Sequence, residues 1–215
     1  MLRDDAITRM REMLGHNSSL QASSFIDALQ DAQETLEKEP ELPWFLRTEI
    51  SSISTTAAEE RVVIPVDFLM MPESDDDGIW VFISGDDNPW RRLRQDHVGF
   101  NRGKYSNEDD AEPKAYSLDN DYFRLFPTPD QIYTLKMIYY ATDAVLTTNI
   151  ENEWLGHIPW LLIAMGVQQV AWGTRDTVAR DTALEVESRQ RARLRAFIVA
   201  REVADMPLQM GGPHI

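Results

Sequence analysis

Three groups of polar residues in this sequence have types that could do chemistry: acidic turns, four histidines and a run of arginines. The most acidic turn, at 75–78 (DDDG), offers carboxylate oxygens of the kind that bind calcium. An EF-hand loop starting at Asp75 needs glycine at its sixth position and glutamate at its twelfth, where this chain has Trp80 and Asp86. The spacing therefore excludes an EF-hand. We predict a solvated turn here, and the same for the acidic pairs that follow in the chain.

The histidines His16, His97, His157 and His214 are scattered, and none has the HxxH or HExxH spacing of a metal site. No GxSxG elbow, P-loop or GxGxxG is present either. The chain has no cysteine, which excludes disulfides and thiolate metal sites. We therefore predict no catalytic, cofactor-binding or metal-binding residues. The protein is predicted not to be an enzyme, with a site invisible in the sequence as the alternative.

The arginine run consists of Arg189, Arg191, Arg193 and Arg195 in an otherwise acidic chain. One interpretation is a solvated helix in which Glu185 pairs with Arg189 and Glu187 with Arg191 at i,i+4 spacing. The other is a contact between subunits, in which these arginines meet acidic loops of a neighbouring copy. Arginine suits such contacts because its guanidinium binds carboxylates with two hydrogen bonds. The sequence leaves both interpretations open.

Overall charge and hydropathy exclude two classes of protein. Among 215 residues, 21 are Lys or Arg and 36 are Asp or Glu, giving a net charge of −15. Nucleic-acid binding requires a basic surface, so the chain as a whole is not expected to bind DNA. The longest apolar run, 158–167, has 10 residues and contains Pro159, whereas a membrane-spanning helix needs about 20. The first 11 residues lack the apolar core of a signal peptide, and we expect a soluble protein without a membrane partner.

Helical periodicity occupies both ends of the chain. The apolar spacing predicts helices at 4–14, 19–38, 152–172 and 175–204, with Gly15 and Gly173 ending two of them and Thr174 capping the last. Ser18 or Ser19 is the expected cap of the second helix. Pro43, Trp44 and Phe45 lie in a compact apolar segment (LPWFL, 42–46) that is predicted to be a buried plug after that helix.

Strand signals occupy the middle of the chain. The strongest is 115–144, where 122–126 and 132–140 are predicted to be two strands joined by a tight connection. In the second, Tyr133, Leu135, Met137 and Tyr139 share one face. Other segments are predicted as strands at 50–55, 61–65 and 79–84, a short helix at 89–98 and an exposed loop at 101–113.

These signals predict an α+β fold. Residues 1–48 and 145–206 form a helical core, and 49–144 form an inserted antiparallel β-domain of five or six strands. The last nine residues, 207–215 (PLQMGGPHI), carry no charged side chain apart from the terminal carboxylate. They are expected either to fray or to become ordered on a partner.

The order of these segments resembles the head–tail adaptor (connector) proteins of tailed bacteriophages, including the tail-tubular type. The likeness lies in the N-terminal helical pair, LPWFL at 42–46, RVVIPVDFL at 61–69, YFRLFPTPDQIYTLKMIYY at 122–140 and the long charged helix near the end. It covers about 160 residues. Another neck, tail-completion or head-decoration protein of the virion is the alternative.

The resemblance implies a structural protein of the virion neck, assembled in the bacterial cytoplasm as a ring of twelve copies under the portal. Its partners would be the portal protein, other copies of itself, and tail, nozzle or tail-fibre proteins. DNA would pass through the ring during ejection without sequence-specific binding, and no cofactor is implied. The resemblance assigns portal binding to the C-terminal residues, here Leu208, Met210, Pro213, His214 and Ile215.

Overall fold

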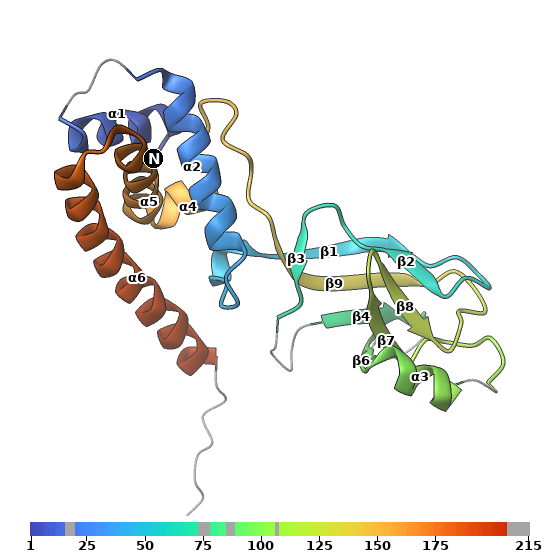
Figure 1. Ribbon diagram of the computed structural model, residues 1–215. Helices are drawn as coiled ribbons and strands as arrows, with labels where there is room; N and C mark the ends of the chain where they lie inside the picture. Colours follow the sequence, from blue (N-terminus) through green and yellow to red (C-terminus); the bar gives the residue numbers. More distant parts are fainter. Residues whose placement is uncertain (16–19, 73–77, 85–88, 106–107, 206–215) are drawn as a thin grey trace, which may run out of the picture. The chain divides into compact units, whose positions relative to one another are not determined.

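The computed structural model describes residues 1–15, 20–72, 78–84, 89–105 and 108–205, with side chains described as far as residue 199 (Figure 1). Helices and mainly antiparallel sheets make an α+β fold, which confirms the predicted fold class. The chain divides into two compact units. The helical unit comprises Met1–Phe45 and Asp143–Ile215, and the β unit comprises Leu46–Thr142.

Helix α5 is the centre of the helical unit. It packs against the other four helices of this unit, and seven apolar side chains between Leu161 and Ala171 are buried. A helix that is apolar on nearly all sides is stable only when its neighbours cover it. The helices are α1 (Arg3–Met13), α2 (Ala22–Glu37), α4 (Glu153–His157), α5 (Pro159–Thr174) and α6 (Thr177–Asp205).

The sequence predicted one helix over 152–172, and this prediction is wrong. The helix is interrupted at Ile158, whose φ of −138° and ψ of 57° are not helical. The cause is Pro159, because its ring disfavours the helical conformation of the residue before it. Pro159 then begins α5, where its missing N–H costs nothing.

The glycine predicted to end α1 lies one residue further on than expected: Leu14 is the C-cap, and Gly15 follows it with a φ of +64°. The caps between α5 and α6 were not predicted correctly. Arg175, rather than Gly173, adopts the left-handed conformation that ends α5 (φ +60°). Asp176, rather than Thr174, caps α6, and its Oδ1 accepts a hydrogen bond from the N–H of Ala179 at 3.0 Å. Ser18 and Ser19 lie outside the described residues.

The β unit contains two sheets. The first has the order β1-β9-β4-β5, with β3 also paired to β9, and the second has the order β2-β8-β7-β6. All pairs are antiparallel except β6 with β7. The strands are β1 (Arg47–Ser54), β2 (Arg61–Val63), β3 (Phe68–Met70), β4 (Gly78–Phe82), β5 (Trp90–Arg92), β6 (Arg94–Gln95), β7 (Ala115–Asp119), β8 (Tyr122–Phe126) and β9 (Thr134–Ala141).

One hydrophobic core lies between the two sheets. Leu135, Met137 and Tyr139 of β9 contribute to it from the first sheet, together with Tyr133 just before the strand. Phe123 of β8 contributes from the second. The predicted face of 132–140 is therefore confirmed.

The segments 122–126 and 132–140 are both strands, but they do not pair with each other. β8 belongs to the second sheet and pairs with β2 and β7, whereas β9 is central in the first sheet. The hairpin partner of β8 is β7, and the turn between them contains Asn120 with a φ of 54°. The expected total of five or six strands was too low, because β7 and other short strands were not recognised in the sequence.

The prediction for 89–98 is wrong, and the loop predicted at 101–113 is wrong over its first five residues. The segment 89–98 holds β5 and β6 instead of a helix, because buried Leu93 lies between them where the chain crosses from one sheet to the other. A helix follows at Val98–Tyr105 (α3), whereas 108–113 contains no helix or strand. Its Asn101 is fully buried and donates a hydrogen bond to Ser117 Oγ at 2.9 Å.

Candidate interaction surface

The length difference between α5 and α6 creates the most distinctive surface of the helical unit. The two helices are joined by a tight corner at Arg175 and Asp176, so that they run antiparallel. α5 has 16 residues and α6 has 29, so α6 is longer by 13 residues, or about 20 Å at 1.5 Å per residue. The last turns of α6 therefore continue past the end of α5 (Figure 1).

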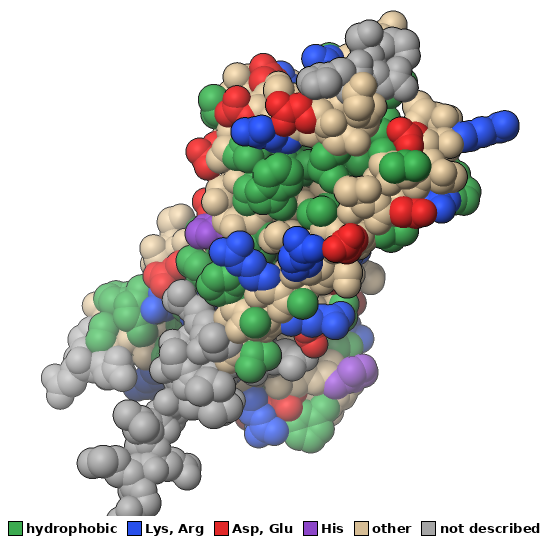
Figure 2. All heavy atoms as spheres, turned by 90° about the vertical axis from the view of Figure 1, so that its left-hand side faces the viewer, with side chains coloured by type: hydrophobic (Ala, Val, Ile, Leu, Met, Phe, Trp, Pro, Cys, Tyr) green, Lys and Arg blue, Asp and Glu red, His purple; other side chains and the backbone are tan. Residues whose placement is uncertain are grey.

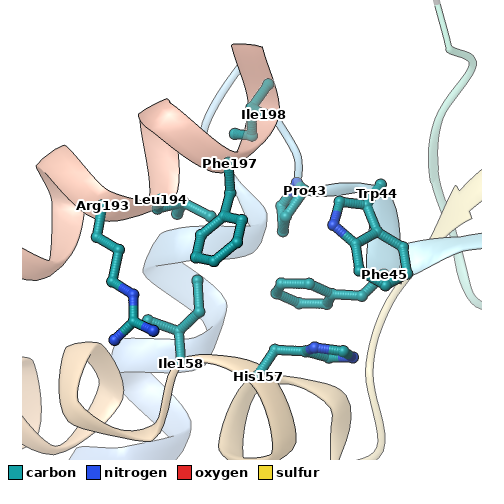
Figure 3. A pocket seen from close by; sticks show the side chains of 9 residues that line it. All are labelled: Pro43, Trp44, Phe45, His157, Ile158, Arg193, Leu194, Phe197 and Ile198. Atoms are coloured by element: carbon teal, nitrogen blue, oxygen red, sulfur yellow. The ribbon is translucent and has the colours of Figure 1, made fainter. Parts of the chain in front are cut away.

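A groove lies where α6 begins to extend past α5. Its walls come from the segment before β1, from the α4–α5 junction and from α6 (Figure 3). The lining residues are Pro43, Trp44, Phe45, His157, Ile158, Arg193, Leu194, Phe197 and Ile198.

Aromatic rings form one wall of this groove. The ring of Phe45 stacks on His157 at a centroid distance of 4.6 Å, and it also meets Trp154 edge-on at 5.2 Å and Trp44 edge-on at 6.0 Å. Trp44 meets His157 edge-on at 5.1 Å. Such packing fixes the rings, but it leaves Trp44 39% exposed and Phe197, on the opposite wall, 50% exposed. The segment 42–46 is thus only partly the buried plug that the sequence predicted.

The four arginines of α6 occupy different environments. Arg191 is half-buried and holds Glu187 at 2.6 Å and Glu39 at 2.5 Å. Arg189 pairs with Glu185 at 2.9 Å on the exposed surface. Both i,i+4 pairs of the solvated-helix interpretation are therefore present.

For the two remaining arginines, the structure gives no ion pair with a described carboxylate of their own chain. Arg193 lies over the ring of Phe197, with its guanidinium carbon 5.6 Å from the ring centroid, at the edge of the groove. Arg195 is exposed, and no ion pair joins it to another described side chain. Figure 2, which looks onto α6, shows apolar side chains gathered above basic ones on this face of the helical unit.

An apolar aromatic groove edged by arginines is suited to binding a protein surface. A comparison with protein-family models matched residues 1–210 to the SU10 adaptor protein family, a family of phage head–tail adaptors. The chain belongs to the SU10 adaptor family. This confirms the resemblance read from the sequence, and it makes the protein a structural component of a phage virion. A comparison with curated proteins gave no match.

A buried polar network holds α4, and with it His157, in the adaptor's helical unit. Glu37 Oε1 accepts hydrogen bonds from Gln33 Nε2 at 2.9 Å, from the N–H of Asp143 at 3.1 Å and from Trp154 Nε1 at 3.3 Å. Asn152 joins the network by donating to Gln33 Oε1 at 3.0 Å. Burial is the largest cause that raises the pKa of Glu37 and also that of Asp143.

This network was not predicted from the sequence, because 19–38 was interpreted by its apolar residues alone. Gln33 and Glu37 lie one turn apart on the same side of α2 as buried Leu29 and Leu36. Two polar residues at i,i+4 within an apolar face were the available signal.

The sequence also contained a signal for the groove, because the apolar residues assigned to α6 do not fall on one face. Val178, Leu184 and Phe197 are exposed, whereas Leu194 is buried.

The structure describes some of the adaptor's other candidate residues. No group of three or more His, Cys, Asp or Glu side chains in the described ranges could hold a metal ion. Of the described histidines, His157 pairs with Glu153 at 3.3 Å, and His97 Nδ1 accepts a hydrogen bond from Gly99. His16, His214 and the acidic turn at 75–77 lie outside the described part, as do Leu208, Met210, Pro213 and Ile215. None of the helices described is long and apolar enough to cross a membrane.

Proposed function

We propose that this adaptor forms a homo-oligomeric ring that joins the portal of the phage head to the tail and continues the DNA channel. The observation that carries the proposal is the family match over 210 of the 215 residues. Ring closure by identical subunits needs two different surfaces on each copy. The groove face of α6 has the properties of one of them, because apolar area surrounded by charged side chains is typical of the centre of a protein interface.

The arginines support the same proposal with unequal weight. Arg189, Arg193 and Arg195 are exposed at the surface of α6, where they can meet carboxylates of a neighbouring copy. Arg191 contributes indirectly, because its ion pair with Glu39 holds α6 within its own subunit, whereas its other partner, Glu187, lies on α6 itself. The net charge of −15 favours an acidic channel that repels DNA phosphates and lets the genome slide.

The C-terminal residues are proposed to bind the portal. α6 ends at Asp205, directly before the uncharged segment 207–215 that includes Leu208, Met210, Pro213, His214 and Ile215. An uncharged, partly apolar segment can bind by becoming ordered in a groove of its partner. The β unit is then free to contact tail, nozzle or tail-fibre proteins.

Electron microscopy of the adaptor mixed with purified portal rings tests this proposal. We expect a second ring coaxial with the portal, with twelve copies in the averaged end view. A protein that stays monomeric and never joins the portal contradicts the proposal. Binding at the periphery of a head or tail assembly would favour a decoration or tail-completion protein instead.

A further inference from the structure

The corner between α5 and α6 carries the most exposed aromatic side chain of the described residues. Trp172 is 75% exposed, and Val178 on the first turn of α6 is 77% exposed beside the same corner. The guanidinium carbon of Arg180 lies 5.9 Å from the centroid of the Trp172 ring. An apolar indole that is held in place at a helix corner is a common form of interface anchor, because tryptophan is enriched among residues that dominate binding energy.

The groove at the other end of α6 has the complementary chemistry. The groove is open to solvent, and Trp44 and Phe197 present partly exposed rings to it. Aromatic pairs are most favourable in offset or edge-on contact, which rings on two walls can provide. Arg193 at the edge adds a cation that attracts the face of an aromatic ring.

The corner cannot fill the groove of its own chain. Val178 and Phe197 are 19 residues apart on one continuous helix, which corresponds to about 28 Å along its axis. The corner and the groove are therefore two separate surfaces at the two ends of a rigid element. A surface that complements a groove elsewhere on the same molecule joins copies head to tail.

We propose that Trp172 of one copy inserts into the groove formed by Trp44, Phe45 and Phe197 of the next copy. This inference rests on the proposed self-association into a ring, and it names the two surfaces that meet. Asp181 lies one turn after the corner, where it pairs with Arg180 at 3.1 Å while its side chain stays 67% exposed, so its carboxylate can also approach Arg193 at the edge of the neighbouring groove. Repeated head to tail, this contact closes a ring when the rotation from one copy to the next divides a full turn.

The absence of cysteine allows a direct test by disulfide cross-linking. The full-length variants Val178→Cys, beside the corner, and Arg193→Cys, at the edge of the groove, are mixed in equal amounts, in the presence of portal rings, and oxidised; both keep Trp172, Trp44 and Phe197. We expect a covalent dimer that contains one copy of each variant. The matched control replaces Arg193→Cys by Val66→Cys, a fully exposed position of the β unit, and should give no dimer above background. Equal yields from the two mixtures overturn the inference.

A second experiment uses one defective surface in each variant. Trp172→Ala removes the anchor, and Phe197→Glu blocks the groove, while circular dichroism verifies that both variants are folded. Each variant alone should need at least about 30-fold more protein to assemble than the wild type, as expected for an interface anchor. In a mixture of the two, the intact corner of Phe197→Glu can bind the intact groove of Trp172→Ala. The surfaces left over are both defective, so the mixture should form dimers that grow no further.

The outcomes separate this inference from the proposed function. Wild-type protein that forms no ring with or without portal contradicts the proposed function itself. If the wild type forms rings and Trp172→Ala forms them equally well, the corner-to-groove contact is contradicted. The proposed adaptor function is then unaffected.

Discussion

Glu37 of α2 accepts a hydrogen bond from the indole Nε1 of Trp154 on α4, at 3.3 Å inside the helical unit. The two residues are far apart in the sequence, and Trp154 is 1% exposed. The same carboxylate oxygen accepts the backbone N–H of Asp143, where the chain enters the helical unit after β9. This carboxylate therefore anchors the second half of the helical unit to the first.

Replacing Glu37 by Gln should change how stability depends on pH. Burial raises the pKa of Glu37 above its ordinary value of 4.5, so the folded protein binds a proton more readily than the unfolded chain does. As pH falls toward 4.5 through the raised pKa, this group's contribution to the free energy of unfolding increases, and it levels off below 4.5. Glu37→Gln keeps an oxygen acceptor but loses this titration.

The measurement is urea unfolding of the wild type and Glu37→Gln between pH 7 and pH 4. The wild type should gain stability relative to the variant as the solution is acidified. Glu34→Gln, an exposed change on the same helix, is the control for removing one negative charge. A wild-type-minus-variant difference that stays constant with pH would show that Glu37 does not titrate differently on folding.

Asn152→Ala should destabilise the helical unit by about 2 kcal/mol, because it removes a cap and leaves a buried polar partner. Asn152 Oδ1 accepts the N–H of Leu155 at 2.9 Å, and its Nδ2 donates to Gln33 Oε1 at 3.0 Å. Asn149→Ala is the matched control, since Asn149 caps α1 through one exposed hydrogen bond to the N–H of Asp4. Equal losses in the two variants, measured by denaturant unfolding, would mean that burial of the Asn152 network adds nothing.

The elements with strong periodicity were predictable, and those set by contacts distant in the sequence were not. The alternation of Leu135, Met137 and Tyr139 placed β9 correctly, because a buried strand repeats every two residues. The partners of β8 were not predictable from its neighbour in the sequence, β9. Which strands pair depends on how side chains from the whole β unit pack into one core. The segment 89–98 was missed because buried Leu93 lies among charged residues, so no local pattern indicates two short strands.

The groove was beyond sequence reasoning for a similar reason. It exists because α6 is 13 residues longer than α5, and the start of α5 depends on the break at Ile158 and Pro159. The arginines that drew attention in the sequence do lie on this helix. What distinguishes Arg191 from the others is its ion pair with Glu39, a residue far away in the chain, and the sequence does not show this contact.

Arg191→Ala should lower the free energy of unfolding by about 1.5 kcal/mol, because a partly buried arginine loses charge-assisted hydrogen bonds to two carboxylates. Arg189→Ala removes a single exposed pair on the same helix, and should change stability by less than about 0.5 kcal/mol. Guanidinium would screen these ion pairs, so the comparison is made in urea. An Arg191 variant as stable as the Arg189 variant would contradict the structural role.

The double variant Arg189→Glu with Arg195→Glu should keep its fold and lose assembly. Both side chains are exposed, so the reversed charges cost little within the subunit. At an interface they would face carboxylates of the acidic neighbouring copy, and like charges repel most strongly at low salt. Analytical ultracentrifugation with portal present, at low and high salt, measures the effect. Unchanged assembly at both salt concentrations would mean that these two arginines are solvent-exposed residues without a role in assembly.

Deletion of residues 207–215 should abolish portal binding without affecting the fold. The deleted segment follows α6 and holds the proposed portal-binding residues Leu208, Met210, Pro213, His214 and Ile215. The groove, the corner and the buried network all lie before it in the sequence, so unfolding in urea should match the wild type. Co-sedimentation with portal rings gives the measurement, with 207–215 replaced by a Gly/Ser sequence of equal length as the control for chain length. Because that control restores length without apolar side chains, it should also fail to bind. Binding by the control would mean that the segment acts only as a spacer, and the portal contact would then belong to the described part of the chain.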